Sequence, residues 1–203
     1  LKLIVKLKKT NETLYLIYTL KYKMKNYKII IADDHPFFRN GLKHAIHEYS
    51  DAMVSEAGSA EEAIKMIFAE DFDLLISDVS MTGRSGIDLL KQVVLNKPSL
   101  PVLMLSFHGE EEYAVRAFRA GAKGFLNKQC SIPELINAIN IILSGKKYIP
   151  PKVAEIFSEN LFSEKNGLPH ELLSDRELEV FKLIVDGKNN KNISAALSLS
   201  QTT

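Results

Sequence analysis

The stretch Ile29-Ile30-Ile31-Ala32-Asp33-Asp34-His35-Pro36 decides the fold of this chain, because a buried apolar run ends abruptly in two carboxylates. A second apolar run, Leu74-Leu75-Ile76-Ser77-Asp78, ends in the same way. If these runs are neighbouring parallel strands, three carboxylates converge at the carboxyl edge of one sheet, where open α/β sheets bind ligands. Three close like charges are unfavourable unless a hard divalent cation holds them, and Mg²⁺ prefers oxygen ligands. We therefore predict a magnesium site formed by Asp33, Asp34 and Asp78.

Two further strand ends add polar groups to the same edge. Ser106 follows the run Val102-Leu103-Met104-Leu105, and Lys128 follows Gly124-Phe125-Leu126-Asn127. Seen alone, an Asp-Asp pair is more often a turn or helix cap, and a lysine at a strand end usually faces solvent. Their joint occurrence at successive strand ends favours a site that receives a phosphoryl group. The five histidines show no spacing typical of metal ligands.

Short apolar runs alternate with segments of helical period from Tyr27 onward, which is typical of a parallel α/β sheet. The expected strands are 27–32, around 53–56, 73–77, 101–106 and 123–127. The expected helices between and after them are 37–49, a segment capped by Ser59 and Glu62, 86–95, 111–120 and 132–143. The fold class is therefore α/β, with a doubly wound five-stranded parallel sheet over residues 25–144.

The carboxyl-terminal part predicts a second, helical unit. Residues 145–170 mix Gly, Pro, Lys, Ser and Asn and are expected to be a linker, with room for one helix at 151–161. A capping box at Ser174 and Glu177 then opens a helix that ends at Gly187, a fitting left-handed cap. A second helix is expected at about 191–197.

Composition limits the classes of protein that remain. The chain has 203 residues, 46% hydrophobic and 25% charged, and its single Cys130 suits a reducing cytoplasm. The apolar stretches are far too short to span a membrane. Residues 1–24 hold six lysines against Glu12, whereas the rest carries a net charge of −4 and has no overall basic footprint for nucleic acid. We expect this basic extension to lie outside the fold.

These motifs resemble a known family. Residues 27–144 are similar to response-regulator receiver domains, which are CheY-like or flavodoxin-like sheets. Residues 171–203, with Leu-Ser-x-Arg-Glu-x-Glu-Val at 173–180 followed by Gly187, are similar to the start of a LuxR-type helix-turn-helix domain. Together they resemble the NarL/FixJ group of two-component regulators.

The resemblance implies a role for each residue at the acidic edge. Asp78 would accept the phosphoryl group, and Asp34, Asp78 and the backbone carbonyl of Ser80 would hold Mg²⁺, with Asp33 acting largely through water. Lys128 and Ser106 would bind phosphoryl oxygens, and Phe125 would swing inward as a switch. Receivers commonly have proline four residues after the phosphoacceptor, whereas Thr82 stands here and is expected to alter the lifetime of the phosphoryl group.

The resemblance also implies partners and an output. A sensor histidine kinase would donate the phosphoryl group, and phosphorylation would support homodimerisation through either of two helical faces. The protein would then control transcription by binding paired DNA half-sites. We expect a cytoplasmic protein that is no enzyme, beyond Mg²⁺-dependent phosphorylation and slow self-dephosphorylation.

Two alternatives stay open at this point. An aspartyl-phosphate phosphatase would typically carry a second aspartate where Ser80 stands, which argues against that reading. A receiver that acts through protein–protein interaction or dimerisation, without DNA binding, is the other. Because only Gln201, Thr202 and Thr203 would supply the recognition helix, we expect an incomplete helix-turn-helix over 171–203 and no sequence-specific DNA binding by this chain as it stands.

Overall fold

The computed structural model describes residues 27–107, 110–155, 175–185, 187–189 and 192–194. The basic extension, the capping-box residue Ser174, most of the expected linker and most of the expected helix at 191–197 lie outside these residues.

Five parallel strands form one sheet in the order β2-β1-β3-β4-β5, so the doubly wound prediction is confirmed. From β1 the chain first adds β2 on one side and then adds β3 on the other side, so β1 pairs with both β2 and β3. This reversal is the topological switch point at which such sheets bind ligands. The strands are β1 (Lys28–Ala32), β2 (Met53–Ala57), β3 (Leu74–Asp78), β4 (Val102–Ser106) and β5 (Gly124–Asn127).

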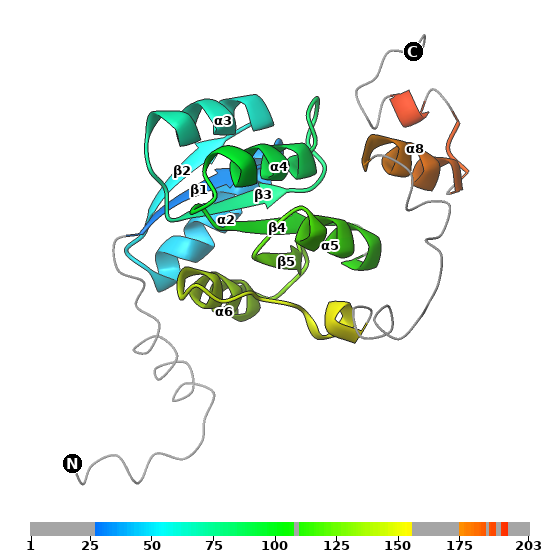
Figure 1. Cartoon of the computed structure of the whole chain (residues 1–203). Helices are drawn as coiled ribbons and strands as arrows, with labels where there is room; N and C mark the ends of the chain where they lie inside the picture. Colours follow the sequence, from blue (N-terminus) through cyan, green and yellow to red (C-terminus); the bar gives the residue numbers. More distant parts are fainter. Residues whose placement is uncertain (1–26, 108–109, 156–174, 186, 190–191, 195–203) are drawn as a thin grey trace, which may run out of the picture.

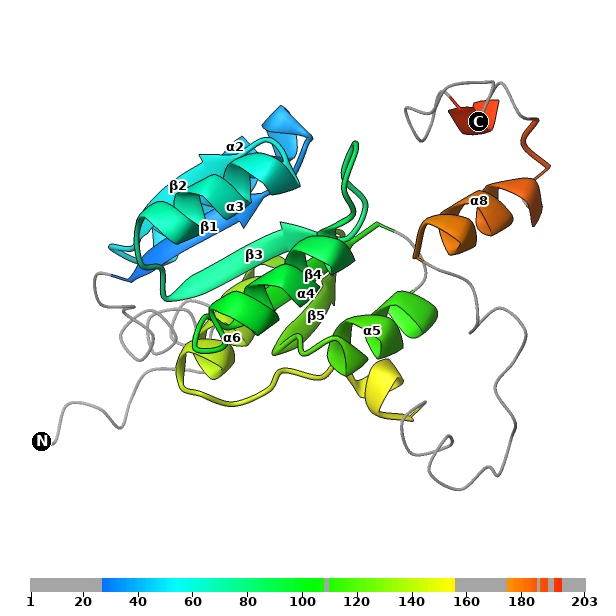
Figure 2. The same ribbon diagram turned by 45° about the horizontal axis from the view of Figure 1, so that its top comes forward.

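Helices cover both faces of the sheet (Figures 1 and 2). One face carries α3 (Ala60–Ala69), α4 (Gly86–Asn96) and α5 (Glu110–Arg119), and the other carries α2 (Pro36–Tyr49) and α6 (Ile132–Leu143). Alternate residues of each strand enter the two cores. Ile30 and Leu75 pack under the first set of helices, whereas Ile29 and Leu74 pack under the second. Burial on both faces explains why these strands are continuous apolar runs.

Local sequence signals start two of these helices, α3 and α6. The Ser59 hydroxyl accepts a hydrogen bond from the Glu62 amide at 3.2 Å. The Glu62 carboxylate reaches back one residue further than in a standard capping box, to the amide of Gly58 at 2.6 Å. At the other end of the sheet, Ser131 caps α6 with Pro133 in its first turn.

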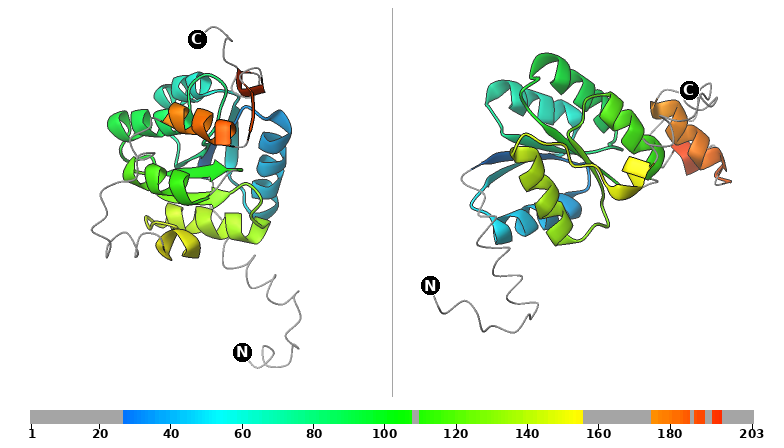
Figure 3. Two further views of the ribbon diagram at one scale, coloured as in Figure 1. Left: turned by 90° about the vertical axis from the view of Figure 1, so that its right-hand side faces the viewer. Right: turned by 60° about the horizontal axis from the view of Figure 1, so that its bottom comes forward.

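Part of the expected linker packs on the sheet. The Tyr148 amide donates to the Lys123 carbonyl at 2.8 Å, and Tyr148 forms a parallel bridge with Gly124, beside the edge strand β5. A short helical stretch follows at 151–155 (Figure 3). Its Val153 is fully buried in the core under α3, α4 and α5. Residues 146–155 therefore cross from the α6 face to the α5 face and cover the exposed edge of β5.

The described carboxyl-terminal helix is α8 (Asp175–Val185). Gly187 has φ +74° and ends it, and the amide of Lys188 donates to the Leu183 carbonyl at 2.9 Å, as the left-handed cap predicted. Phe181, Ile184 and Val185 are exposed on it. In the described part of the chain, no helix has the length and apolar character needed to cross a membrane.

Candidate functional site

The carboxyl edge of the sheet brings the three predicted carboxylates together. Strands β1 and β3 are paired in parallel with Ala32 opposite Ser77, so the residues that follow them share one edge. Ligand atoms of Asp33, Asp34, His35 and Asp78 all lie within 4.8 Å of one another. Such a cluster of oxygen ligands is a candidate site for a divalent cation.

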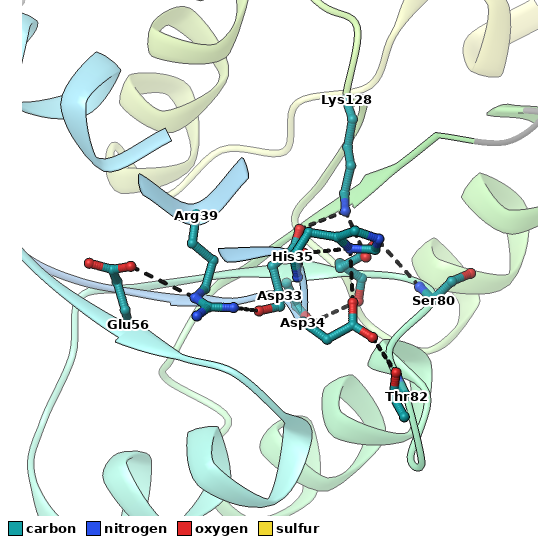
Figure 4. Close-up of polar contacts among 10 residues, drawn as sticks. Asp33, Asp34, His35, Arg39, Glu56, Ser80, Thr82 and Lys128 are labelled. Carbon is teal, nitrogen blue, oxygen red and sulfur yellow. Dashed lines mark hydrogen bonds and ion pairs between the residues drawn. The ribbon is translucent and has the colours of Figure 1, made fainter. Parts of the chain in front are cut away.

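Lys128 supplies the positive charge inside this cluster. Its Nζ lies 2.6 Å from Asp33 Oδ2 and 2.6 Å from Asp78 Oδ2, and its side chain is fully buried. The rings of Phe38 and Phe107 cover the ammonium group, with centroids 4.6 and 4.8 Å from Nζ. Figure 4 shows the lysine reaching the carboxylates from the end of β5. An ammonium group without water must find its partners in the protein, and here both are carboxylates.

Asp78 is the most perturbed acid of the cluster. Burial raises the pKa of its carboxyl to about 6, although the neighbouring Lys128 ammonium lowers it and Asp33 raises it further. The Ser80 amide donates a hydrogen bond to Asp78 Oδ1 at 3.3 Å. Asp78 is therefore a buried carboxyl group whose pKa lies above its ordinary value of 3.8.

Asp34 has a different environment. Its Oδ2 accepts two hydrogen bonds from Thr82, from the amide at 2.8 Å and from the hydroxyl at 2.5 Å (Figure 4). Burial would raise the pKa of the Asp34 carboxyl, but these two bonds and the nearby His35 outweigh burial and hold that pKa below its ordinary value. The second oxygen, Oδ1, is buried and lies 2.9 Å from His35 Nδ1.

Asp33 is fully occupied by protein donors. Its Oδ1 accepts a hydrogen bond from the His35 amide at 2.8 Å, and its Oδ2 pairs with Lys128. The Arg39 guanidinium donates to the Asp33 backbone carbonyl, and its Nε lies 3.7 Å from the Glu56 carboxylate. Asp33 therefore holds the lysine at the centre of the cluster.

Of the remaining predicted residues, Ser106 and Ser80 lie at the same edge, and Phe125 lies within β5. Ser106 ends β4 and is buried, and its carbonyl accepts the amide of Lys128 at 2.8 Å. Ser80 begins the loop that follows β3, and its backbone is held near Asp78. Phe125 is fully buried in the core beneath α3, α4 and α5. Its movement on phosphorylation stays a prediction.

The structure also identifies residues that the sequence analysis missed. A Cβ atom on Gly86 would lie 1.7 Å from the Asp78 carbonyl oxygen, so only glycine lets α4 start against the end of β3. His35, set aside for its spacing, has its Nδ1 2.9 Å from Asp34 Oδ1 and 3.1 Å from Asp33 Oδ1. A glycine at a helix start and a histidine directly after two aspartates are the signals that could have indicated them.

The residues present fit a hard divalent cation. Asp34 Oδ1 is a buried oxygen that lies beside His35 Nδ1 and among other carboxylate oxygens at the switch point of the sheet. Such oxygen ligands suit Mg²⁺. A buried carboxylate beside a lysine and a cation is also an arrangement that can accept a phosphoryl group.

Comparisons with known proteins agree with this geometry. Residues 29–140 match the response regulator receiver domain, and residues 171–203 match the luxR family of bacterial regulatory proteins. The chain is 34% identical over 184 residues to the oxygen regulatory protein NreC of Staphylococcus carnosus, covering 87% of this chain and 85% of NreC.

Two solved structures extend the likeness. A LuxR-family two-component response regulator from Aurantimonas sp. SI85-9A1 has a TM-score of 0.63 and 29% identity, and the match covers 68% of this chain and 99% of that one. A structure of two RcsB dimers bound to two parallel DNAs has a TM-score of 0.62 and 26% identity, covering 88% of this chain and 86% of that one.

Proposed function

The chain belongs to the two-component response regulators, with a receiver domain followed by a LuxR-type DNA-binding domain, and we propose that Asp78 is its phosphoacceptor. Proteins of this family are transcription regulators and not enzymes. The observation that carries the proposal is the position of Asp78: it ends β3, it is buried, and it lies 2.6 Å from the Lys128 ammonium. The proposed donor is a sensor histidine kinase.

Ionisation and charge balance explain why Asp78 suits this role. A carboxylate is a weak nucleophile, so the charge of the incoming phosphoryl group must be neutralised as the bond forms. Above a pH of about 6 the Asp78 carboxyl is ionised, and one of its oxygens attacks phosphorus while the donor's leaving group departs with the bonding pair. Lys128 then donates to a phosphoryl oxygen as a charge-assisted hydrogen-bond donor, and Ser106 binds another.

The residues proposed to hold Mg²⁺ are Asp34, Asp78 and the carbonyl of Ser80, with Asp33 acting through water. When bound, the cation would supply positive charge for the oxygens of the phosphoryl group. The buried Oδ1 of Asp34, which lies beside the His35 ring nitrogen and the other carboxylates, supports its assignment as a direct ligand, whereas the hydrogen bonds that Asp33 accepts from the His35 amide and from Lys128 support an indirect role.

The proposed output is phosphorylation-dependent control of transcription in the cytoplasm. Phosphorylation shifts an equilibrium between inactive and active conformers and supports a homodimer that binds DNA through the LuxR-type domain. The similarity to RcsB, whose dimers are seen on DNA, supports this output. The single cysteine of the chain supports a reducing compartment.

The test is phosphoryl labelling of the full chain by a small phosphodonor with Mg²⁺. The parent should take up one hydroxylamine-labile phosphoryl group, and Asp78→Asn should take up none, because the amide has no anionic oxygen to attack with. The matched control is Asp71→Asn, which changes a highly exposed aspartate that pairs with Lys97 and should leave labelling unchanged. Undiminished labelling of the Asp78→Asn protein would show that the acceptor is another residue.

A further inference from the structure

Thr82 lies in the loop between β3 and α4, four residues after Asp78. The loop leaves the sheet with Met81 buried, turns at Gly83 with φ +85°, and enters α4 through the Ser85 cap. Thr82 itself is exposed, so the hydrophobic core does not require a threonine there. Its place in the structure must be explained by its polar contacts.

Both donors of Thr82 reach the same oxygen of one carboxylate. The amide and the hydroxyl lie 2.8 and 2.5 Å from Asp34 Oδ2, across 48 positions of the sequence. An ionised carboxylate offers about four acceptor positions, and Thr82 uses two of them on one oxygen. The other oxygen, Oδ1, is buried within the cluster that includes Asp78, where it lies 2.9 Å from His35 Nδ1.

We propose that Thr82 is a positioning residue: its amide and hydroxyl together fix the Asp34 carboxylate so that Oδ1 is presented to the divalent cation. The inference rests on the proposed function, in which Asp34 is a direct ligand. A carboxylate that is 19% exposed can rotate about its Cβ–Cγ bond unless something holds it. Two donors on one oxygen prevent that rotation before the cation arrives, and such pre-organisation favours binding.

The residue type at position 82 decides how many donors are available. Threonine provides an amide and a hydroxyl, and its β-branched side chain restricts χ1. Serine retains both donors, valine keeps the amide and the shape but loses the hydroxyl, and proline provides neither. The three variants therefore form a graded series in which the number of hydrogen bonds to Asp34 falls from two to one to none.

The experiment measures Mg²⁺ binding to the unphosphorylated full chain by isothermal titration calorimetry. The Thr82→Ser protein should bind Mg²⁺ about as tightly as the parent, whereas the Thr82→Val protein should bind it about 2- to 10-fold more weakly, the equivalent of one net hydrogen bond. The Thr82→Pro protein should bind Mg²⁺ more weakly than the Thr82→Val protein. The control is Ser144→Ala, which removes an exposed hydroxyl at the far end of α6 and should leave Mg²⁺ affinity unchanged.

A second measurement separates positioning from a merely structural role. In labelling with a small phosphodonor, Thr82→Val should raise the half-saturating Mg²⁺ concentration by the same factor, while the rate at saturating Mg²⁺ equals that of the parent. Equal or tighter Mg²⁺ binding by Thr82→Val would overturn the proposal. The proposed function would still stand if Asp78→Asn abolished labelling, so the two failures are distinguishable.

Discussion

The carboxylate cluster has two sides that are held together in different ways. On the lysine side, Lys128 bridges Asp33 and Asp78, and all three side chains are less than 5% exposed. On the loop side, Asp34 is partly exposed and is held by the hydrogen bonds of Thr82. The lysine side joins the ends of β1, β3 and β5, whereas the loop side joins the end of β1 to a surface loop.

The lysine side is therefore the structural part of the site, and the loop side is the part whose residues can change. Strand ends are fixed by the two cores, so the buried ion pairs between them are part of the folded state and are costly to break. A surface loop can change residue type at little cost in stability. We therefore expect substitutions on the lysine side to act on both stability and phosphorylation, and substitutions on the loop side to act chiefly on metal affinity.

The largest expected effect is that of Lys128→Met, which would test whether the lysine side is structural. It leaves Asp33 and Asp78 buried without their shared cation, and we expect the free energy of unfolding at pH 7 to fall by about 3–5 kcal/mol. Urea denaturation of the metal-free protein measures it. Lys91→Met, which removes an exposed lysine near Asp88, is the control. Equal losses of unfolding free energy for the two variants would show that the lysine side is not structural.

The next effect is a pH dependence that comes from Asp78. Its folded-state pKa of about 6 lies above the ordinary value of 3.8, so the folded state favours the protonated carboxyl. The stability from this group is fully present below pH 3.8 and is lost as pH rises through about 6, a loss of about 3 kcal/mol from the two pKa values.

Asp78→Asn isolates this contribution, because the amide does not titrate. In metal-free denaturant titrations we expect the variant to gain stability relative to the parent by up to about 3 kcal/mol between pH 4 and pH 8. A stability difference that stays constant over this range would mean that the Asp78 carboxylate is not strained by burial.

The smallest effect is expected on the loop side. Thr82→Val removes one exposed hydrogen bond to Asp34 and should lower the free energy of unfolding by only about 1 kcal/mol. Thermal unfolding without Mg²⁺ measures this loss. A loss as large as that of Lys128→Met would show that the loop is as structural as the strand ends, and the distinction between the two sides would fail.

The scaffold and the residues at its carboxyl edge can be read from the amino-acid sequence alone. The apolar runs before Asp33 and Asp78 are continuous because parallel strands are buried on both faces, and this pattern is visible without coordinates. Short-range signals were equally readable: Ser59 caps α3, and Gly187 has the positive φ that ends α8. In each case the physical cause acts within a few residues of the chain, so local sequence is sufficient.

Only the tertiary structure decided which groups touch within that edge. Lys128 meets Asp33 across 95 positions, and Thr82 meets Asp34 across 48. The order of the strands, the path of each loop and the close start of α4 at Gly86 set these contacts. Tertiary structure also sets the contact of Tyr148, which pairs beside β5 although the composition of residues 145–170 predicted a linker. Periodicity indicates which face of a segment is buried, and capping residues indicate where a helix begins or ends. A contact between distant segments depends on the packing of the whole domain.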